Sequence, residues 1–285
     1  MAESASGGAI TSRTRLTVLL GDPVEHSLSP VIHNAAFRAQ GIDAVYLACA
    51  VRAGHLAAAV DGLSALGALG ANVTIPHKQA VLALADDATP TALALGAANT
   101  LVRTEAGWRA DNTDVAGFLA PLDEYRHRLA GASVVVLGAG GAARAVVYAG
   151  LTELGARVTV AARRAEQGEA LAADLRAVGP VEVVGLGDTD AIREAALIVN
   201  ATPLGMGDGR MPVDAAALHA GHIVYDLVYR PAVTPLLAAA AACGATPIGG
   251  LPMLLGQAAA SYRQWTGRDF PLDTTRRAAL AALGR

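Results

Sequence analysis

The feature that most restricts the fold is a series of short, almost wholly apolar runs that alternate with helix-like stretches. Between residues 133 and 229 these runs are SVVVLG, RVTVAA, VEVVG, LIVNAT and HIVYDLVY. Strands this apolar are typical of parallel sheets whose two faces are both covered by helices. We therefore expect a doubly wound α/β domain in this part of the chain.

A second alternating pattern occupies the first part of the chain. Its candidate strands are 15–21, 44–51 and 71–75, and its candidate helices are 29–41, 53–66 and one over 77–85. Residues 99–114 read as a hairpin that turns near Ala106. A helix is expected over 115–129, and the long helical stretch that begins at Leu251 is expected to return to the first domain.

The chain is longer than a typical single domain, so we expect two α/β domains in its 285 residues. The first would comprise 14–114 with 251–285, and the second 115–250. Residues 1–13 are expected to be a flexible N-terminal extension, because they lack the apolar segment of a signal peptide.

The composition excludes several classes of protein. Hydrophobic residues make up 53% and charged residues 16%, which argues against a disordered chain. The net charge of -3 gives no electrostatic reason to expect nucleic acid as a partner. Two cysteines far apart suggest free thiols in a reducing compartment, and hence a cytoplasmic protein. The uncharged stretch 232–262 is broken by glycines and prolines, so we expect no membrane span.

A glycine motif follows the first apolar run of the second domain. VVVLGAGGAARAV fits G-x-G-x-x-A, with Gly138, Gly140 and Ala143 at the defining positions. The first glycine permits a tight turn, the second lets backbone N–H groups approach a pyrophosphate, and the helix N-terminus favours the anion. Because the motif leaves a strand and opens a helix, it predicts a dinucleotide site.

The end of the next strand distinguishes the two nicotinamide cofactors. NAD enzymes usually have Asp or Glu at this position, which hydrogen-bonds the ribose 2′-hydroxyl, whereas this chain has Arg163 and Arg164. A guanidinium can hold a 2′-phosphate by paired, charge-assisted hydrogen bonds. The sequence therefore predicts NADP rather than NAD.

Polar residues mark a possible anion site before the helix expected at 29–41. Ser27 and Ser29 lie two residues apart in HSLSP, a spacing that points both hydroxyls the same way in extended chain. Ser29 is also the expected N-cap of that helix, whereas Ser27 has no expected capping role. Two hydroxyls and a helix N-terminus suit a small carboxylate.

Further polar residues follow strands, where open α/β sheets bind ligands. They are Thr74, Lys78, Asn99 and Asp114. Lys78 is the only lysine in the chain, and every other basic side chain besides histidine is arginine. The DNTD stretch that ends at Asp114 lacks the remaining ligands of a calcium loop, so no metal is expected.

Taken together, these motifs resemble those of the shikimate dehydrogenase family. GDPVEHSLSP, NVTIPHK, AANTL, DNTD, GAGGAAR, NATPLGM, YDLVY and GGLPMLLGQAA occur in the family's order along nearly the whole chain. The resemblance implies an N-terminal substrate-binding domain, a Rossmann-like NADP-binding domain and a cleft between them. It also implies the reversible reduction of 3-dehydroshikimate to shikimate, in aromatic amino-acid biosynthesis.

The resemblance also assigns roles to individual residues. Ser27 and Ser29 would bind the substrate carboxylate, and the residues around the ring hydroxyls would be Thr74, Lys78, Asn99, Asp114, Tyr229 and Gln257. The pyrophosphate would lie against Gly138, Ala139, Gly140, Gly141 and Ala142, with Ala162, Arg163 and Arg164 at the 2′-phosphate. Thr202, Leu227 and Gly250 would line the nicotinamide end. Lys78 and Asp114 would be the catalytic residues.

Three positions depart from the family pattern. Ala162-Arg163-Arg164 replaces the frequent Asn-Arg-Thr, Leu227 stands where Met is frequent, and Gly249 replaces the usual Asp. The first departure loses an amide and gains a charge at the cofactor end. It leaves open which groups hold the 2′-phosphate.

Several alternatives stay open at this point. A quinate or dual quinate/shikimate dehydrogenase has the same layout, and a non-catalytic NADP-binding regulator or a methylene-tetrahydrofolate dehydrogenase is a more distant rival. Lys78 either transfers the proton to the substrate or only stabilises the developing oxyanion. The sequence leaves open monomer or homodimer, and gives His77 no defined role.

Overall fold

The computed structural model describes residues 10–284, and residues 1–9 of the expected N-terminal extension lie outside the described residues. The chain forms two compact units, which divide between Thr113 and Asp114 and again between Gln257 and Ala258. Each unit contains one sheet, which confirms the predicted α/β class with two parallel-rich sheets. The functional assignment of the two domains, with its boundaries at 114/115 and 250/251, stays a prediction.

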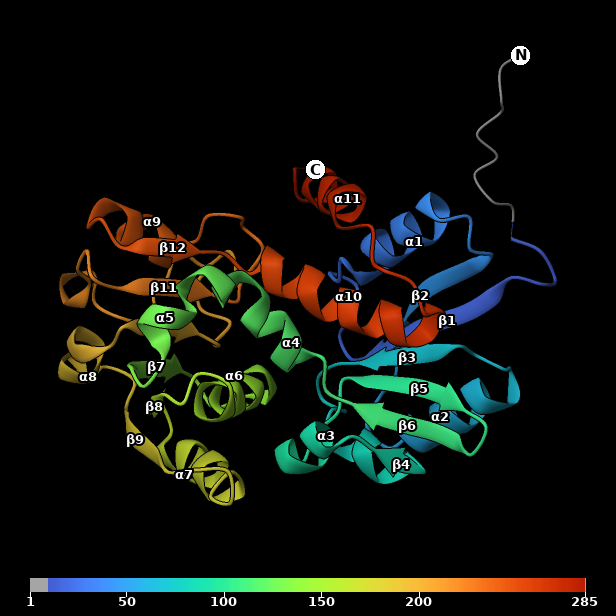
Figure 1. The fold of residues 1–285 in the computed structure, drawn as a ribbon, viewed down its shortest axis with the longest axis horizontal. Helices are drawn as coiled ribbons and strands as arrows, with labels where there is room; N and C mark the ends of the chain where they lie inside the picture. Colours follow the sequence, from blue (N-terminus) through green and yellow to red (C-terminus); the bar gives the residue numbers. More distant parts are fainter. Residues whose placement is uncertain (1–9, 285) are drawn as a thin grey trace, which may run out of the picture. The chain divides into compact units, whose positions relative to one another are not determined.

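The sheet of the first unit has the order β2-β1-β3-β5-β6-β4 (Figure 1). Parallel pairing joins β1 to β2 and β3, whereas β5 pairs antiparallel with both β3 and β6. The hairpin expected at 99–114 is therefore present. The strands are β1 (Arg15–Gly21), β2 (Ala44–Ala50), β3 (Gly70–Val73), β4 (Asp87–Ala88), β5 (Thr100–Thr104) and β6 (Gly107–Asp111).

Helices of the first unit follow the predicted pattern with two exceptions, one of which is α3 (Pro90–Leu95), a helix that was not predicted. The stretch expected as a helix over 77–85 forms only a 3-10 helix, η1 (Ala80–Leu84). It ends there because Asp86 joins the hairpin, accepting from the Trp108 amide at 2.8 Å and donating its own amide to the Trp108 carbonyl. The other helices wholly within this unit are α1 (Ser29–Ala39), α2 (Leu56–Ala65), α3 (Pro90–Leu95) and α11 (Leu272–Leu283).

An aromatic cluster forms one core of the first unit. His33 of α1 stacks on Tyr46 of β2 with ring centroids 4.4 Å apart, and Trp265 lies 5.3 Å from the same imidazole. Trp265 packs so closely over Gly70 that a Cβ there would lie 2.0 Å from the indole nitrogen. Glycine at this position therefore lets the tryptophan reach the sheet.

The sheet of the second unit is wholly parallel and has the order β12-β11-β10-β7-β8-β9. This is the doubly wound order with its reversal between β7 and β10, the position where such sheets bind ligands. The strands are β7 (Ser133–Leu137), β8 (Arg157–Ala162), β9 (Val181–Gly185), β10 (Leu197–Asn200), β11 (Ile223–Asp226) and β12 (Thr246–Ile248).

Two strands of this sheet are shorter than expected. β10 ends at Asn200 rather than 202, and β11 ends at Asp226 rather than 229. In each case the last side chain of the strand accepts a hydrogen bond from the backbone N–H two residues later. These bonds turn the chain out of the sheet.

The helix expected over 115–129 is divided into α4 (Asp114–Leu119), a 3-10 turn η2 (Ala120–Tyr125) and α5 (Arg126–Leu129). Pro121 explains the break, because proline lacks the N–H that an α-helix interior requires. The remaining helices include α10, which contributes residues to both units. They are α6 (Gly141–Thr152), α7 (Ala165–Asp174), α8 (Thr189–Glu194), η3 (Ala215–Ala217), α9 (Pro235–Ala242) and α10 (Leu251–Thr266).

Neither a membrane span nor a metal cluster is found within residues 10–284. None of the described helices combines the length and apolar character needed to cross a bilayer. Likewise, no three His, Cys, Asp or Glu side chains in this part of the chain are grouped so as to hold a metal ion.

Candidate functional site

The two serines of HSLSP lie at the start of α1, but their roles differ from those expected. α1 begins at Ser29 itself, and Leu28 is the N-cap residue without a side-chain bond. The hydroxyl of Ser27 instead accepts the backbone N–H of Ser29 at 3.1 Å. The expected capping by Ser29 is therefore wrong. Ser29 is buried.

Thr74 and Lys78 lie on the loop that follows β3. The amide of Thr74 donates to Leu20 at 2.9 Å, its carbonyl accepts from His77, and the carbonyl of Lys78 accepts from Ala98 at 2.7 Å. One end of the loop is thereby tied to β1 and the other to the segment that precedes β5, and the Lys78 side chain is half-buried.

His77 has a structural role in this loop. Its ring is buried, and Nε2 lies 2.6 Å from the carbonyl oxygen of Val51, just beyond β2. A carbonyl can only accept, so Nε2 carries the proton and donates. The bond anchors the residue next to Lys78 to the sheet.

Asn99 is buried between β3 and the end of β6, and its amide orientation is determined by its partners. Its Oδ1 accepts from the backbone N–H of Thr113 at 2.8 Å, and from the hydroxyls of Thr113 and Thr100 at 3.0 and 2.9 Å. A backbone N–H can only donate, so the atom that faces Thr113 must be the oxygen. The NH₂ group of Asn99 is consequently directed to the other side.

A buried polar network joins Asn99 to Tyr46 within the first unit. The Tyr46 hydroxyl donates to Asn72 Oδ1 at 2.9 Å, and Asn72 Nδ2 donates to the Asn99 carbonyl and to the Thr100 and Ser261 hydroxyls. The sequence did not predict a role for Tyr46, Asn72 or Ser261. Only Asn72, a polar residue within an apolar strand, gave any signal.

Three further predicted substrate residues belong to the second unit. Asp114 is buried and is the first residue of α4. Gln257 of α10 is buried, and its Nε2 donates to the Leu254 carbonyl at 2.9 Å. Tyr229 is half-buried in the loop after β11.

The glycine motif forms the turn from β7 into α6, and its geometry suits a phosphate group. Gly138 has φ +101°, and a Cβ there would lie 2.9 Å from the Thr202 methyl carbon. Gly140 is exposed at the N-cap of α6, where a Cβ would meet no atom within 4 Å. Ala139, Gly141 and Ala142 are half-buried around this open space. The turn therefore fits a dinucleotide pyrophosphate.

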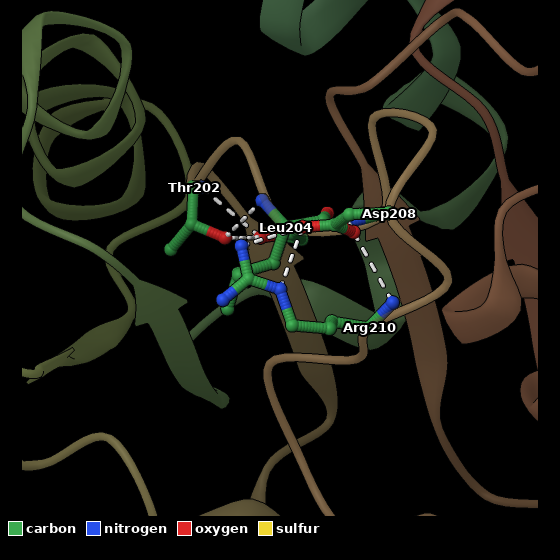
Figure 2. Close-up of polar contacts among 6 residues, drawn as sticks. Thr202, Leu204, Asp208 and Arg210 are labelled. Carbon is green, nitrogen blue, oxygen red and sulfur yellow. Dashed lines mark hydrogen bonds and ion pairs between the residues drawn. The ribbon is translucent and has the colours of Figure 1, made fainter.

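The residues predicted for the nicotinamide end lie in three loops of the second unit, which follow β10, β11 and β12. Thr202 adjoins Gly138 across the reversal point of the sheet, and Gly250 lies so near Leu227 that a Cβ would be 2.2 Å from its carbonyl oxygen. Figure 2 shows the first loop, in which Thr202 and Asp208 each bond the backbone and Asp208 pairs with Arg210 at 2.7 Å.

Arg163 and Arg164 follow β8 directly and are both exposed, while Ala162 is the buried last residue of that strand. Arg164 is the N-cap residue of α7 but makes no side-chain capping bond. The end of β8 is thus followed by two exposed guanidinium groups, which suit the binding of an anionic ligand group.

Comparisons with known proteins agree with this arrangement. Residues 19–101 match the family model for the shikimate dehydrogenase substrate binding domain, and residues 250–280 match that for the shikimate 5'-dehydrogenase C-terminal domain. A curated relative from Salinibacter ruber, named shikimate dehydrogenase (NADP(+)), is 53% identical, covering 92% of this chain and 95% of its own.

Solved structures show the same likeness. A shikimate dehydrogenase in complex with NADP+ superimposes with a TM-score of 0.91 at 36% identity, covering 98% of this chain and 99% of the other. A quinate dehydrogenase from Corynebacterium glutamicum in complex with NAD gives 0.88 at 35% identity, covering 94% and 99%.

Proposed function

The chain belongs to the shikimate dehydrogenase family, and we propose that it catalyses the reversible, NADP-dependent reduction of 3-dehydroshikimate to shikimate in aromatic amino-acid biosynthesis. It is an oxidoreductase with a Rossmann-like domain, and its cofactor is NADP.

Ser27, Ser29 and the start of α1 bind the substrate carboxylate in this proposal. The Ser27 hydroxyl already accepts the Ser29 amide, so its own proton is directed to another acceptor. The partial positive charge at the N-terminus of α1 favours an anion there. Ser29 is buried in the first turn of α1, which makes it a pre-oriented partner rather than a flexible one.

The reacting end of the substrate is assigned to Lys78, Asp114 and Asn99. NADPH supplies the hydride to the carbonyl carbon. Lys78 carries an ammonium that stabilises the negative charge developing on the carbonyl oxygen and gives that oxygen a proton. An arginine cannot replace it, because its pKa is above about 12.

Neighbouring residues orient the substrate for this transfer. Asp114 accepts a hydrogen bond from a ring hydroxyl. Asn99 donates its oriented NH₂ to another ring hydroxyl. Thr74, Tyr229 and Gln257 complete the proposed contacts with the ring.

Arg163 and Arg164 hold the 2′-phosphate of NADP, next to Ala162. The turn at Gly138–Gly140 takes the pyrophosphate, and Thr202, Leu227 and Gly250 border the nicotinamide. The open space at Gly140 and the absence of an acid directly after β8 both support this assignment.

The single observation that supports the catalytic assignment best is the fixed amide of Asn99, whose backbone neighbour Ala98 donates to the Lys78 carbonyl. The test is the turnover of Lys78→Ala and Lys78→Arg with shikimate and NADP. Both should lose about 10²-fold or more in kcat with little change in KM, because Arg keeps the charge but cannot give up a proton. A Lys78→Arg enzyme with normal kcat would instead assign Lys78 a purely electrostatic role.

A quinate or dual quinate/shikimate dehydrogenase is the second candidate, favoured by the likeness to the Corynebacterium glutamicum enzyme. Quinate carries an additional ring hydroxyl and is bulkier at the carbon that bears the carboxylate. The Ser27/Ser29 pair and the arginines after β8 favour shikimate and NADP. Relative kcat/KM for the two acids decides between the candidates.

The proposal also includes a cytoplasmic location and a monomeric or homodimeric assembly. Cell fractionation and light scattering of the purified protein test these two points.

A further inference from the structure

Asn200 and Asp226 form a buried polar pair at the edge of the second sheet. They are the last residues of β10 and β11, stand opposite each other in the parallel register, and are both 0% exposed. Asn200 Nδ2 donates to Asp226 Oδ1 at 2.9 Å. Neither residue has been given a part in substrate or cofactor binding.

Asn200 holds the loop that carries Thr202. Its Oδ1 accepts from the backbone N–H of Thr202 at 3.0 Å and from the Thr202 hydroxyl at 2.7 Å, while Nδ2 donates to the Leu204 carbonyl at 3.1 Å. The Thr202 hydroxyl in turn accepts the Leu204 amide (Figure 2). Both the rotamer of Thr202 and the path of its loop are thereby fixed.

Asp226 holds the neighbouring loop, which carries Leu227. Its carboxylate accepts from the Val228 amide at 3.0 Å and from the Thr234 hydroxyl at 2.6 Å. Thr234 also caps α9 by accepting from Leu237. The Asp226 carboxylate therefore holds both ends of the loop, the start through the Val228 amide and the end through the Thr234 hydroxyl.

The carboxylate of Asp226 faces donors only. Burial raises its pKa, and the bonds from Thr234, Val228 and Asn200 oppose that rise. A buried carboxylate is costly, and well-packed apolar residues often stabilise a core more. The pair lies at the carboxyl edge of the sheet, where ligands bind, which suggests a role beyond stability.

We propose that Asn200 and Asp226 are positioning residues that hold Thr202 and Leu227 in place for the nicotinamide end of the cofactor. The inference rests on the proposed function, which assigns Thr202 and Leu227 to that end. The pair touches neither cofactor nor substrate. Arg163 follows β8, which is separated from β10 by β7, so the adenosine end should not depend on the pair.

The test compares Asp226→Asn and Thr234→Val with the matched control Thr234→Ser. An amide at 226 turns an NH₂ group toward a donor, and Val removes the hydroxyl that Ser retains. We expect a 10- to 100-fold lower kcat for Asp226→Asn and a smaller loss for Thr234→Val, because small displacements of a reacting group are costly. Thr234→Ser should remain within about twofold of the original protein.

Two binding measurements separate positioning from general damage. Calorimetry should give Asp226→Asn and Thr234→Val an unchanged Kd for adenosine 2′,5′-bisphosphate and a several-fold weaker Kd for NADPH, whereas Thr234→Ser should keep both Kd values. The primary isotope effect with 4-deuterated NADPH should rise, because hydride transfer becomes slower. Parallel weakening for both ligands, or an unchanged NADPH Kd with normal kcat, would overturn the inference.

The outcome is distinguishable from failure of the proposed function. If the original protein does not oxidise shikimate, the function is wrong, yet the ratio of the two dissociation constants still reports on positioning. If Asp226→Asn does not fold, Thr234→Val against Thr234→Ser supplies the same ratio.

Discussion

Thr113 donates two hydrogen bonds to Asn99, from its backbone N–H and from its hydroxyl, and both end on the same amide oxygen. The side-chain oxygen of Asn99 is therefore occupied by hydrogen bonds from the protein. These bonds also fix the direction in which the NH₂ group of Asn99 points.

We predict that Asn99→Asp lowers kcat/KM for shikimate about 10- to 100-fold, because the new oxygen can no longer donate to a ring hydroxyl. Steady-state kinetics measure the loss. Thr113→Val should produce a smaller decrease, and Thr113→Ser, which keeps both donors, should leave kcat/KM unchanged. A fully active Asn99→Asp enzyme would show that Asn99 does not bind the substrate.

Cofactor preference should depend on the arginines after β8. Arg163→Ala is expected to lower kcat/KM for NADP by about 100-fold while leaving that for NAD nearly unchanged, since only NADP carries the charge that the guanidinium binds. Arg164→Ala is the matched comparison and should have the smaller effect. The assignment of Arg163 fails if the two substitutions have reversed effects, or if both cofactors lose equally.

Acid stability should be limited by His33. Burial lowers the pKa of this imidazole to about 3, and within the described residues neither ring nitrogen has a hydrogen-bond partner. Protonation below the ordinary value of 6.5 therefore favours the unfolded chain. Between pH 6.5 and pH 5 the free energy of unfolding should fall by roughly 2 kcal/mol from this group.

Chemical denaturation of His33→Phe measures that contribution. Phe cannot be protonated and suits the aromatic neighbours Tyr46 and Trp265, so the variant should lose less stability than the original protein over the same pH interval. Equal losses in the two proteins would exclude His33 as the cause.

The strands were predictable from the sequence because burial on both faces makes their composition distinctive. The interruptions of the expected helices were harder to predict from the sequence. Pro121 interrupts the helix expected at 115–129, and Asp86 joins the hairpin at Trp108 before the helix expected at 77–85 can form. Such tertiary bonds outweigh local helix propensity.

The candidate site was predictable only where a local motif marks it, as at Gly138 and at Lys78. The residues that orient the site were missed, because their partners are distant in the sequence. Asn72 bonds to Ser261 and Asn200 bonds to Asp226, and no spacing rule connects either pair.

The most direct test of the proposed function is the initial rate of oxidation of shikimate and of quinate, each with NADP and with NAD. We predict that kcat/KM is highest for shikimate with NADP, and that it falls when either the acid or the cofactor is exchanged. A higher kcat/KM for quinate, or a preference for NAD, would contradict the proposed function.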